Sequence, residues 1–159
     1  MPRAQLQKTE EQILLDHVSK YLTGDLLKIL CDMGHDDVLI LADGNFPAET
    51  VARRLLRYPG LDTSVVLRGL VDIFPLDVNY TVYPACVMDL TKEDKAKGMQ
   101  PPPAWEDFRS ILRPRYGEIE LGMIERFDFY ERARKAYAVV QTGEERQYGN
   151  LLLVKGVVY

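Results

Sequence analysis

Short apolar runs bounded by polar turns mark the strands that this chain is expected to form. Val38–Ala42 holds five apolar residues in succession and has no polar face, as expected of a strand covered on both sides. Residues 137–141 and Leu151–Val154 have the same character, and the turn residues Thr142-Gly143 follow the first of them. These segments predict three buried strands.

Three other segments are less regular. Residues 80–88 combine aromatic and β-branched side chains and predict a strand, in which Pro84 favours a sheet edge or a bulge. Residues 118–127 predict a further strand. Residues 49–58 contain helix-forming side chains but have the length of a strand, so both assignments stay open.

Helical spacing of apolar residues predicts two helices before the first strand. Thr9 and Gln12 have the spacing of a capping box, and apolar side chains recur at helical intervals as far as Tyr21. A second helix is expected to begin near Thr23. It should end at Gly34, where a helix C-cap favours a positive φ.

Later helices are predicted by their caps and stops. Asp62 or Thr63 should cap a helix that Pro75 stops. Residues 91–103 are charged and proline-rich and predict a solvated loop, which a short helix containing Trp105 follows.

The last predicted helix begins after Asp128 and ends at Ala136. Strands that alternate with helices indicate an α/β fold. We therefore expect one three-layer α/β/α domain with a central mixed sheet over residues 21–159, preceded by an N-terminal helical extension at residues 1–20.

Composition narrows the class of protein. A chain of 159 residues with 47% apolar content can build one proper core. The net charge is -4 and the basic residues are scattered, which argues against nucleic acid and acidic membranes as partners. Cys31 and Cys86 lie in apolar segments and are expected to be buried free thiols. With no secretion signal and no membrane-spanning run, we expect a cytoplasmic protein.

Familiar catalytic motifs are missing from the sequence. It has no phosphate-binding glycine loop, no nucleophile elbow and no histidine pair at metal-ligand spacing. We therefore expect neither a metal site nor a cofactor. What remains is a set of polar residues at strand ends and in loops, where α/β proteins bind ligands: His35, Asp43, Asp77, Tyr130, Tyr148 and Asn150.

Each of these residues also has a structural explanation. His35 could satisfy carbonyls at a helix terminus, Asp43 could be a turn residue, and Tyr130 could be half-buried packing. His35 and Asp43 also flank one strand, so about 3.3 Å per residue places them about 25 Å apart. They could share one site only through a neighbouring subunit or a fold-back of the chain.

Several runs of residues resemble the family that contains L-fucose mutarotase and D-ribose pyranase, and within it the animal-type fucose mutarotases. The resemblance extends from about residue 22 to the C-terminus. The matching runs are Met33-Gly34-His35, Leu41-Ala42-Asp43, Asn45-Phe46-Pro47-Ala48, Pro75-Leu76-Asp77, residues 124–133 and Tyr148-Gly149-Asn150-Leu151.

The resemblance implies an isomerase that interconverts the α and β anomers of L-fucose by acid–base-assisted ring opening and closure. It implies that His35 is the catalytic acid–base, and that Asp43, Asp77, Tyr130, Tyr148 and Asn150 contact the sugar. No metal or cofactor is required, because proton transfers suffice. The resemblance also implies a homo-oligomer, from a dimer up to a decameric ring, whose sites neighbouring chains complete.

Pro59 stands where members of the family usually have an acidic residue, which leaves the sugar preference open. Two alternatives also stay open. One is a pyranose–furanose isomerase of the D-ribose pyranase type, and the other is a non-catalytic sugar-binding protein of the same fold. The second proton-transfer group could be Tyr148 or a held water.

Overall fold

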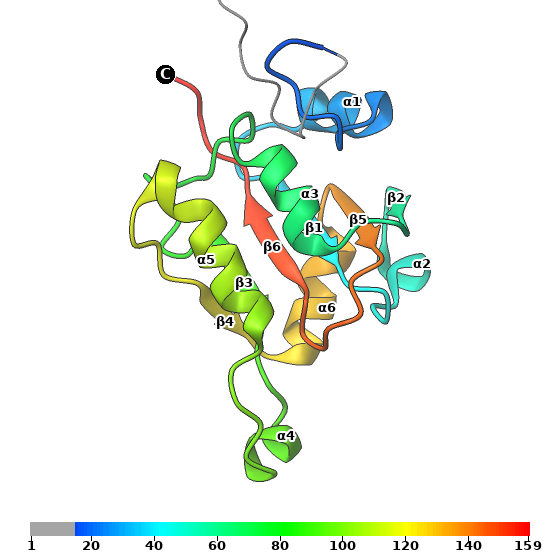
Figure 1. Cartoon of the computed structure of the whole chain (residues 1–159), viewed down its shortest axis with the longest axis vertical. Coiled ribbons are helices and arrows are strands. Elements are labelled where there is room, and N and C mark those ends of the chain that lie inside the picture. The colour runs from blue at the N-terminus through cyan, green and yellow to red at the C-terminus, as the bar shows by residue number, and fades with distance from the viewer. Residues whose placement is uncertain (1–14) are drawn as a thin grey trace, which may run out of the picture.

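The computed structural model describes residues 15–159, and six strands within this range form one mixed sheet in the order β2-β5-β1-β6-β3-β4 (Figure 1). In chain order the elements are α1 (Gly24–Asp32), β1 (Val38–Ala42), α2 (Ala48–Val51), β2 (Leu55–Tyr58), α3 (Thr63–Leu70), β3 (Ala85–Met88), α4 (Lys92–Ala96), α5 (Pro103–Tyr116), β4 (Gly122–Ile124), α6 (Arg126–Lys135), β5 (Ala138–Thr142) and β6 (Leu151–Val154).

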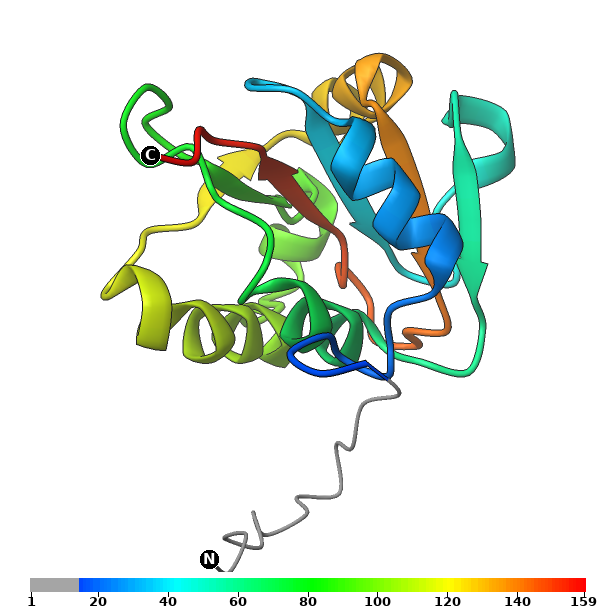
Figure 2. The same ribbon diagram turned by 90° about the horizontal axis from the view of Figure 1, so that it is seen from above.

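Helices cover both faces of this sheet. Side chains alternate along a strand, so Leu39 and Leu41 of β1 face a core shared with α1, α3 and α5, whereas Ile40 and Ala42 face a core shared with α2 and α6. Figure 2 shows α3 and α5 along one side of the sheet and α6 along the other. The predicted three-layer α/β/α domain is confirmed.

Two helix starts follow from their capping residues. Thr23 Oγ1 accepts the Leu26 N–H at 3.2 Å and caps α1, and Asp62 Oδ1 accepts the Val65 N–H at 2.8 Å and caps α3. The positive φ predicted for Gly34 is wrong, because Asp36 takes it instead at 68°. The Asp37 carboxylate accepts the Gly34 N–H at 2.7 Å and holds this turn.

The helix predicted between Thr9 and Tyr21 is wrong for the part that the structure describes. Residues 15–21 form turns, with an isolated bridge between Leu15 and Val18. The Leu22 N–H donates to the Ser19 carbonyl at 3.0 Å, which folds this segment back on itself. The rest of that prediction, including the extension at residues 1–14, lies outside the described residues.

Two strand predictions need correction. The segment at residues 80–88 pairs only over Ala85–Met88, and β3 lies between β6 and β4 rather than at an edge. Pro84 precedes the strand, and its carbonyl accepts the Val154 N–H at 2.8 Å. The segment at residues 118–127 pairs only over Gly122–Ile124.

Three local predictions change as well. Residues 49–58 form both a helical turn, α2, and a strand, β2. The Asp128 cap is wrong: Glu125 caps α6, and its carboxylate accepts the Phe127 N–H at 2.7 Å. The expected loop at residues 91–103 contains α4, and Cys31 is exposed although both cysteines are free.

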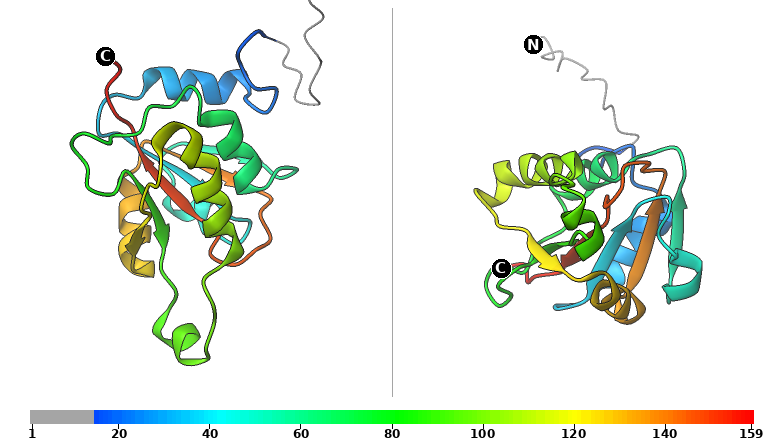
Figure 3. Two further views of the ribbon diagram at one scale, coloured as in Figure 1. Left: turned by 60° about the vertical axis from the view of Figure 1, so that its left-hand side comes forward. Right: turned by 90° about the horizontal axis from the view of Figure 1, so that it is seen from below.

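Strand direction defines two ends of the sheet. β1, β2 and β5 run parallel, and β6 runs antiparallel to both of its neighbours, β1 and β3. The end of β1 therefore lies beside the start of β6, and we call this the α4 end of the sheet. The opposite end, where β6 finishes, we call the C-terminal end. Figure 1 and the left view of Figure 3 show α4 and the C-terminus at opposite ends of the molecule.

Candidate active site

A polar pocket of about 350 Å³ opens at the α4 end of the sheet. Four of the residues singled out in the sequence meet here: Asp43, Tyr130, Tyr148 and Asn150. The pocket is further lined by Asn45, Phe46, Met88, Asp94, Arg126 and Gln147. Its volume is in the range of small-molecule sites.

Asp43 and Asn150 form one buried unit at the floor of this pocket. The Asp43 N–H donates to Asn150 Oδ1 at 2.8 Å, and Asn150 Nδ2–H donates to Asp43 Oδ2 at 3.0 Å. Burial raises the pKa of the Asp43 carboxyl, although hydrogen bonds from the Asn45 N–H and the Asn150 amide oppose this effect. Each carboxylate oxygen keeps a lone pair that a ligand hydroxyl can use.

Tyr130 supplies an aromatic wall. It is half-buried on α6, and its ring meets the Phe46 ring edge to face at a centroid distance of 5.5 Å. An aromatic face covers apolar C–H surface while carboxylate and amide groups bind hydroxyls. The pocket thus combines both kinds of surface that a polyhydroxylated ring presents.

Tyr148 stands in an unusual backbone conformation, with φ at 60°. Such a value is uncommon for a bulky residue and requires support from the surrounding structure. Trp105 Nε1–H donates to the Tyr148 carbonyl at 3.1 Å. A Cβ atom on Gly149 would lie 2.5 Å from Glu144 Cγ, so only glycine fits at that position.

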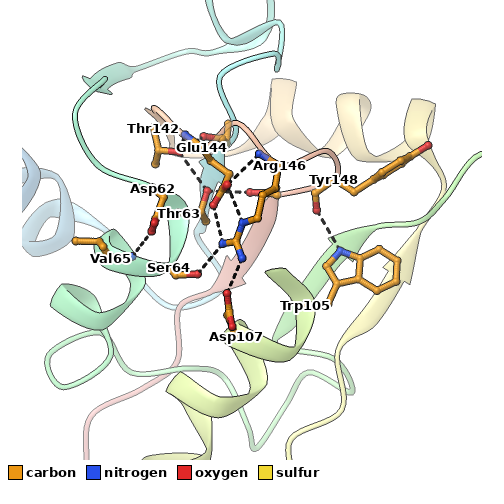
Figure 4. Close-up of polar contacts among 12 residues, drawn as sticks. Asp62, Thr63, Ser64, Val65, Trp105, Asp107, Thr142, Glu144, Arg146 and Tyr148 are labelled. Atoms are coloured by element: carbon orange, nitrogen blue, oxygen red, sulfur yellow. Dashed lines mark hydrogen bonds and ion pairs between the residues drawn. The ribbon is translucent and has the colours of Figure 1, made fainter. Parts of the chain in front are cut away.

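A charged network holds the loop that carries Tyr148. Arg146 Nε donates to Glu144 Oε1 at 2.9 Å, and the same guanidinium reaches Asp107 Oδ2 at 2.6 Å and Ser64 Oγ at 3.3 Å. Burial of Glu144 acts to raise its pKa, but the hydrogen bonds and charge of Arg146 outweigh it and lower that pKa. Figure 4 shows this network, with the Tyr148 side chain directed away from it.

His35 lies at the C-terminal end of the sheet, away from that pocket. Its Nε2 is 3.3 Å from Asp77 Oδ1, and Thr81 Oγ1 donates to Asp77 Oδ2 at 2.5 Å. The Asp77 side chain is 2% exposed and that of His35 is 43% exposed. The ring of Tyr80 packs against His35 at a centroid distance of 5.2 Å.

The buried carboxylate selects one tautomer of His35. A carboxylate beside Nε2 favours a proton on that nitrogen. The Nδ1 atom is then the nitrogen that can exchange a proton with a ligand. One Asp77 oxygen faces His35 and the other accepts from Thr81, and each keeps a second lone pair.

The predicted residues therefore form two groups at opposite ends of one sheet. His35 and Asp77 form one group, and Asp43, Tyr130, Tyr148 and Asn150 form the other. The chain does not fold back to join them, because His35 is not among the residues that line the pocket of Asp43.

Among the residues that the sequence pattern did not single out are Asp94 and Arg126 in the pocket, and Tyr80 against His35. Thr91 and Asp94 do have capping spacing, which could have indicated a helix there. Pro59 lines a different hollow, next to Gly143. A Cβ atom on Gly143 would lie 2.0 Å from the Pro59 carbonyl oxygen.

Within residues 15–159, no cluster of three or more histidine, cysteine or acidic side chains is arranged to hold a metal ion. No helix in the same part of the chain has the length and apolar character needed to cross a membrane.

The fold and the pocket define a mixed-sheet α/β protein with a small polar binding site at its strand ends. The chain belongs to the RbsD / FucU transport protein family, whose sequence profile matches residues 17–158. It is 44% identical to the fucose mutarotase of Homo sapiens over 149 residues, which are 92% of this chain and 96% of that protein.

Solved structures agree with this assignment. The fucose mutarotase of Streptococcus pneumoniae in complex with L-fucose matches with a TM-score of 0.81 and 36% identity, over 91% of this chain and 100% of that one. RbsD of Bacillus subtilis complexed with D-ribose matches with a TM-score of 0.62 and 25% identity, over 87% and 95% of the two chains.

Proposed function

We propose that this protein is an L-fucose mutarotase, an isomerase that interconverts the α and β anomers of the pyranose. The observation that carries the proposal is the polar pocket around Asp43 and Asn150 in a chain 44% identical to a fucose mutarotase. The higher similarity to the structure holding L-fucose than to the one holding D-ribose favours the six-carbon sugar as substrate.

The pocket binds the sugar through its hydroxyls and its apolar face. Asp43 accepts hydrogen bonds from neighbouring hydroxyls, and Asn150 fixes the position of that carboxylate. Tyr130 covers the C–H face of the ring, with Phe46 behind it. These contacts hold the pyranose so that its anomeric carbon faces the groups that move protons.

The reaction needs one proton removed from the anomeric hydroxyl and one delivered to the ring oxygen. The C1–O5 bond then breaks, the aldehyde rotates, and the ring closes on its other face. His35 performs one of the two transfers through Nδ1, and Asp77 stabilises the imidazolium form of His35. Positioned proton transfer contributes roughly 10²–10⁴-fold to such a rate.

A second copy of the chain completes this site. His35 lies at the opposite end of the sheet from the pocket of its own chain, so it acts on a sugar held by a neighbour. The surface near His35 supports the assembly. Tyr80 packs against His35 and its hydroxyl meets that of Tyr159, and Val82 and Val158, close to these tyrosines in the chain, are 85% and 78% exposed. Apolar side chains gathered at one end of a molecule are typical of a contact surface.

Two further features belong to the same proposal. Residues 21–159 form the mutarotase domain, as the sequence predicts. The protein acts in the cytoplasm, where thiols such as Cys31 and Cys86 stay reduced; both are unpaired in the structure.

Saturation-transfer NMR on L-fucose, D-galactose and D-ribose tests the proposal. We expect the protein to exchange the two anomer signals of L-fucose faster than the uncatalysed reaction. Faster exchange between pyranose and furanose signals of D-ribose, with L-fucose unaffected, would make the protein a pyranase. Sugar binding without any added exchange would make it a binding protein.

A further inference from the structure

The hydroxyl of Tyr148 has two partners on the α4 segment. It donates a hydrogen bond to Asp94 Oδ2, and it accepts the Thr91 N–H at 3.2 Å. Asp94 and Tyr148 both line the sugar pocket. These contacts join the wall of the pocket to an element that the sequence pattern treated as a solvated loop.

Both partners come from the first turn of α4. Thr91 caps the helix, and its Oγ1 accepts the Asp94 N–H at 3.2 Å. In an ordinary capping box, the carboxylate at the position of Asp94 would accept the N–H of the capping residue. Here Tyr148 takes that N–H instead, and the Asp94 carboxylate accepts the phenol proton.

α4 has one further polar contact, which joins it to the end of β3. Lys95 Nζ lies 2.5 Å from Asp89 Oδ2, which ties the helix to the residue after β3. The left view of Figure 3 shows α4 projecting beyond the strands, past the end of the sheet where β1 finishes. Asp94 therefore lines the pocket from α4, outside the sheet.

This arrangement determines how Tyr148 can meet a sugar. A phenol has one proton to donate and two lone pairs that accept. Its proton is committed to Asp94, and one lone pair is used by the Thr91 N–H. One lone pair remains, so a sugar hydroxyl in the pocket must donate to Tyr148 rather than accept from it.

We propose that Asp94 is a positioning residue that makes Tyr148 the proton acceptor for the anomeric hydroxyl, which rests on the proposed mutarotase function. The anomeric proton moves to Tyr148 Oη as the phenol proton moves to Asp94. The C1–O1 double bond forms, the C1–O5 bond breaks, and O5 takes a proton from the His35 imidazolium of the neighbouring copy. Ring closure reverses both transfers, so no proton is gained or lost.

The charge on Asp94 suits this role. The hydrogen bond from Tyr148 lowers the pKa of the Asp94 carboxyl, with Thr91 and Lys97 acting in the same direction. The carboxylate is therefore ionised at neutral pH, and it is the group that the phenol proton of Tyr148 faces.

Four variants separate a relay from a tether: Asp94→Asn, Tyr148→Phe, the double variant, and Glu93→Gln as the control. Asp94→Asn keeps the shape and an acceptor oxygen but removes the base. We expect its rate of L-fucose anomer exchange to fall about tenfold while L-fucose affinity and melting temperature stay near wild type. Glu93→Gln removes the same charge one residue away and should leave exchange unchanged.

The double variant tests whether the two residues act as one unit. If Asp94 works through Tyr148, it should be no slower than Tyr148→Phe alone. A second measurement needs no activity: ¹³C NMR of the Asp94 carboxyl should show a higher pKa in Tyr148→Phe than in wild type.

Each outcome decides between the proposals. Wild-type exchange in Asp94→Asn, or an Asp94 pKa unmoved by Tyr148→Phe, overturns the relay while leaving the mutarotase function intact. A wild-type protein that shows no exchange overturns the mutarotase function and the relay together. If Asp94→Asn loses exchange while wild type and Glu93→Gln stay active, the result supports both the mutarotase function and the relay.

Discussion

At the scale of single residues, His35 depends on a carboxylate that is almost completely buried. Asp77 has one oxygen facing His35 Nε2 and the other bonded to Thr81, and its N–H donates to the Val154 carbonyl at 3.0 Å. The imidazole itself is partly exposed and contributes little to the core. Its removal should therefore change chemistry more than stability.

We expect His35→Ala to fold and melt like wild type and to lose anomer exchange. Loss of a positioned acid–base typically lowers a rate roughly 10²–10⁴-fold. Saturation-transfer NMR measures the exchange, and circular dichroism at matched concentration controls for folding. A variant that folds and exchanges at the wild-type rate would remove His35 from the mechanism.

Asp43 should make stability depend on pH, because burial raises its pKa above the ordinary value of 3.8. A raised carboxyl pKa contributes stability below pH 3.8 that is lost as pH rises through the folded-state pKa. The stability of Asp43→Asn relative to wild type should therefore increase over that pH window, by about 1.4 kcal/mol for each pH unit between the unfolded-state and folded-state pKa values. Urea unfolding at a series of pH values measures the difference, and a constant difference would contradict a raised pKa.

At the scale of elements, the loop between β5 and β6 relies on the Glu144–Arg146 pair. Glu144 is 3% exposed, so removal of its partner leaves a nearly buried charge. We expect Arg146→Met to lose about 2 kcal/mol of unfolding free energy. This is less than the loss expected when a fully buried ion pair is broken, because Arg146 is partly exposed. Arg146→Lys should lose less unfolding free energy, since it keeps the positive charge and loses only the bidentate hydrogen bonds to Glu144.

The same pair predicts a pH effect of opposite sign to that of Asp43. The pKa of Glu144 is lowered in the folded state, so its contribution is present above pH 4.5 and is lost as pH falls through the folded-state pKa. The destabilisation by Arg146→Met should therefore shrink in acid. Urea unfolding of wild type and variant at neutral and acid pH tests this, and an undiminished difference in acid would contradict it.

Sequence patterns predicted the elements whose signals are local. The bounds of β1 and the caps at Thr23 and Asp62 match the structure, because an apolar run and a side-chain cap need only their neighbours. The cap of α6 was misplaced, since Glu125 and Asp128 both have capping chemistry and only packing decides between them. Residues 80–83 have strand-like side chains but find no partner strand within the described part of the chain.

At the scale of the whole molecule, the candidate site could be predicted only in part. The sequence and the family resemblance identified the six candidate residues, among them His35, Asp43 and Tyr148. They lie in two groups because they stand at opposite ends of the strands. The contact between Asp94 and Tyr148 joins residues 54 positions apart in the chain. No pattern within a short window can show such a contact.

Assembly should depend on the apolar surface near His35. Val158 is 78% exposed in one chain, and Val158→Asp places a charge where a neighbour would pack. We expect this variant to fold, to have a smaller mass in solution than wild type and to lose anomer exchange. Light scattering measures the mass, and an unchanged mass with full exchange would show that this surface is free in solution.

The shared site is tested most directly by mixing two inactive variants. His35→Ala keeps an intact pocket, and Asp43→Asn keeps an intact histidine at the other end of the chain. If each site joins the His35 of one copy to the pocket of another, random mixed oligomers contain about a quarter of wild-type sites. Saturation-transfer NMR of L-fucose should then show exchange that neither variant gives alone, at about a quarter of the wild-type rate. A mixture that stays as inactive as its components, after subunit exchange has been verified, would contradict a site built from two copies of this chain.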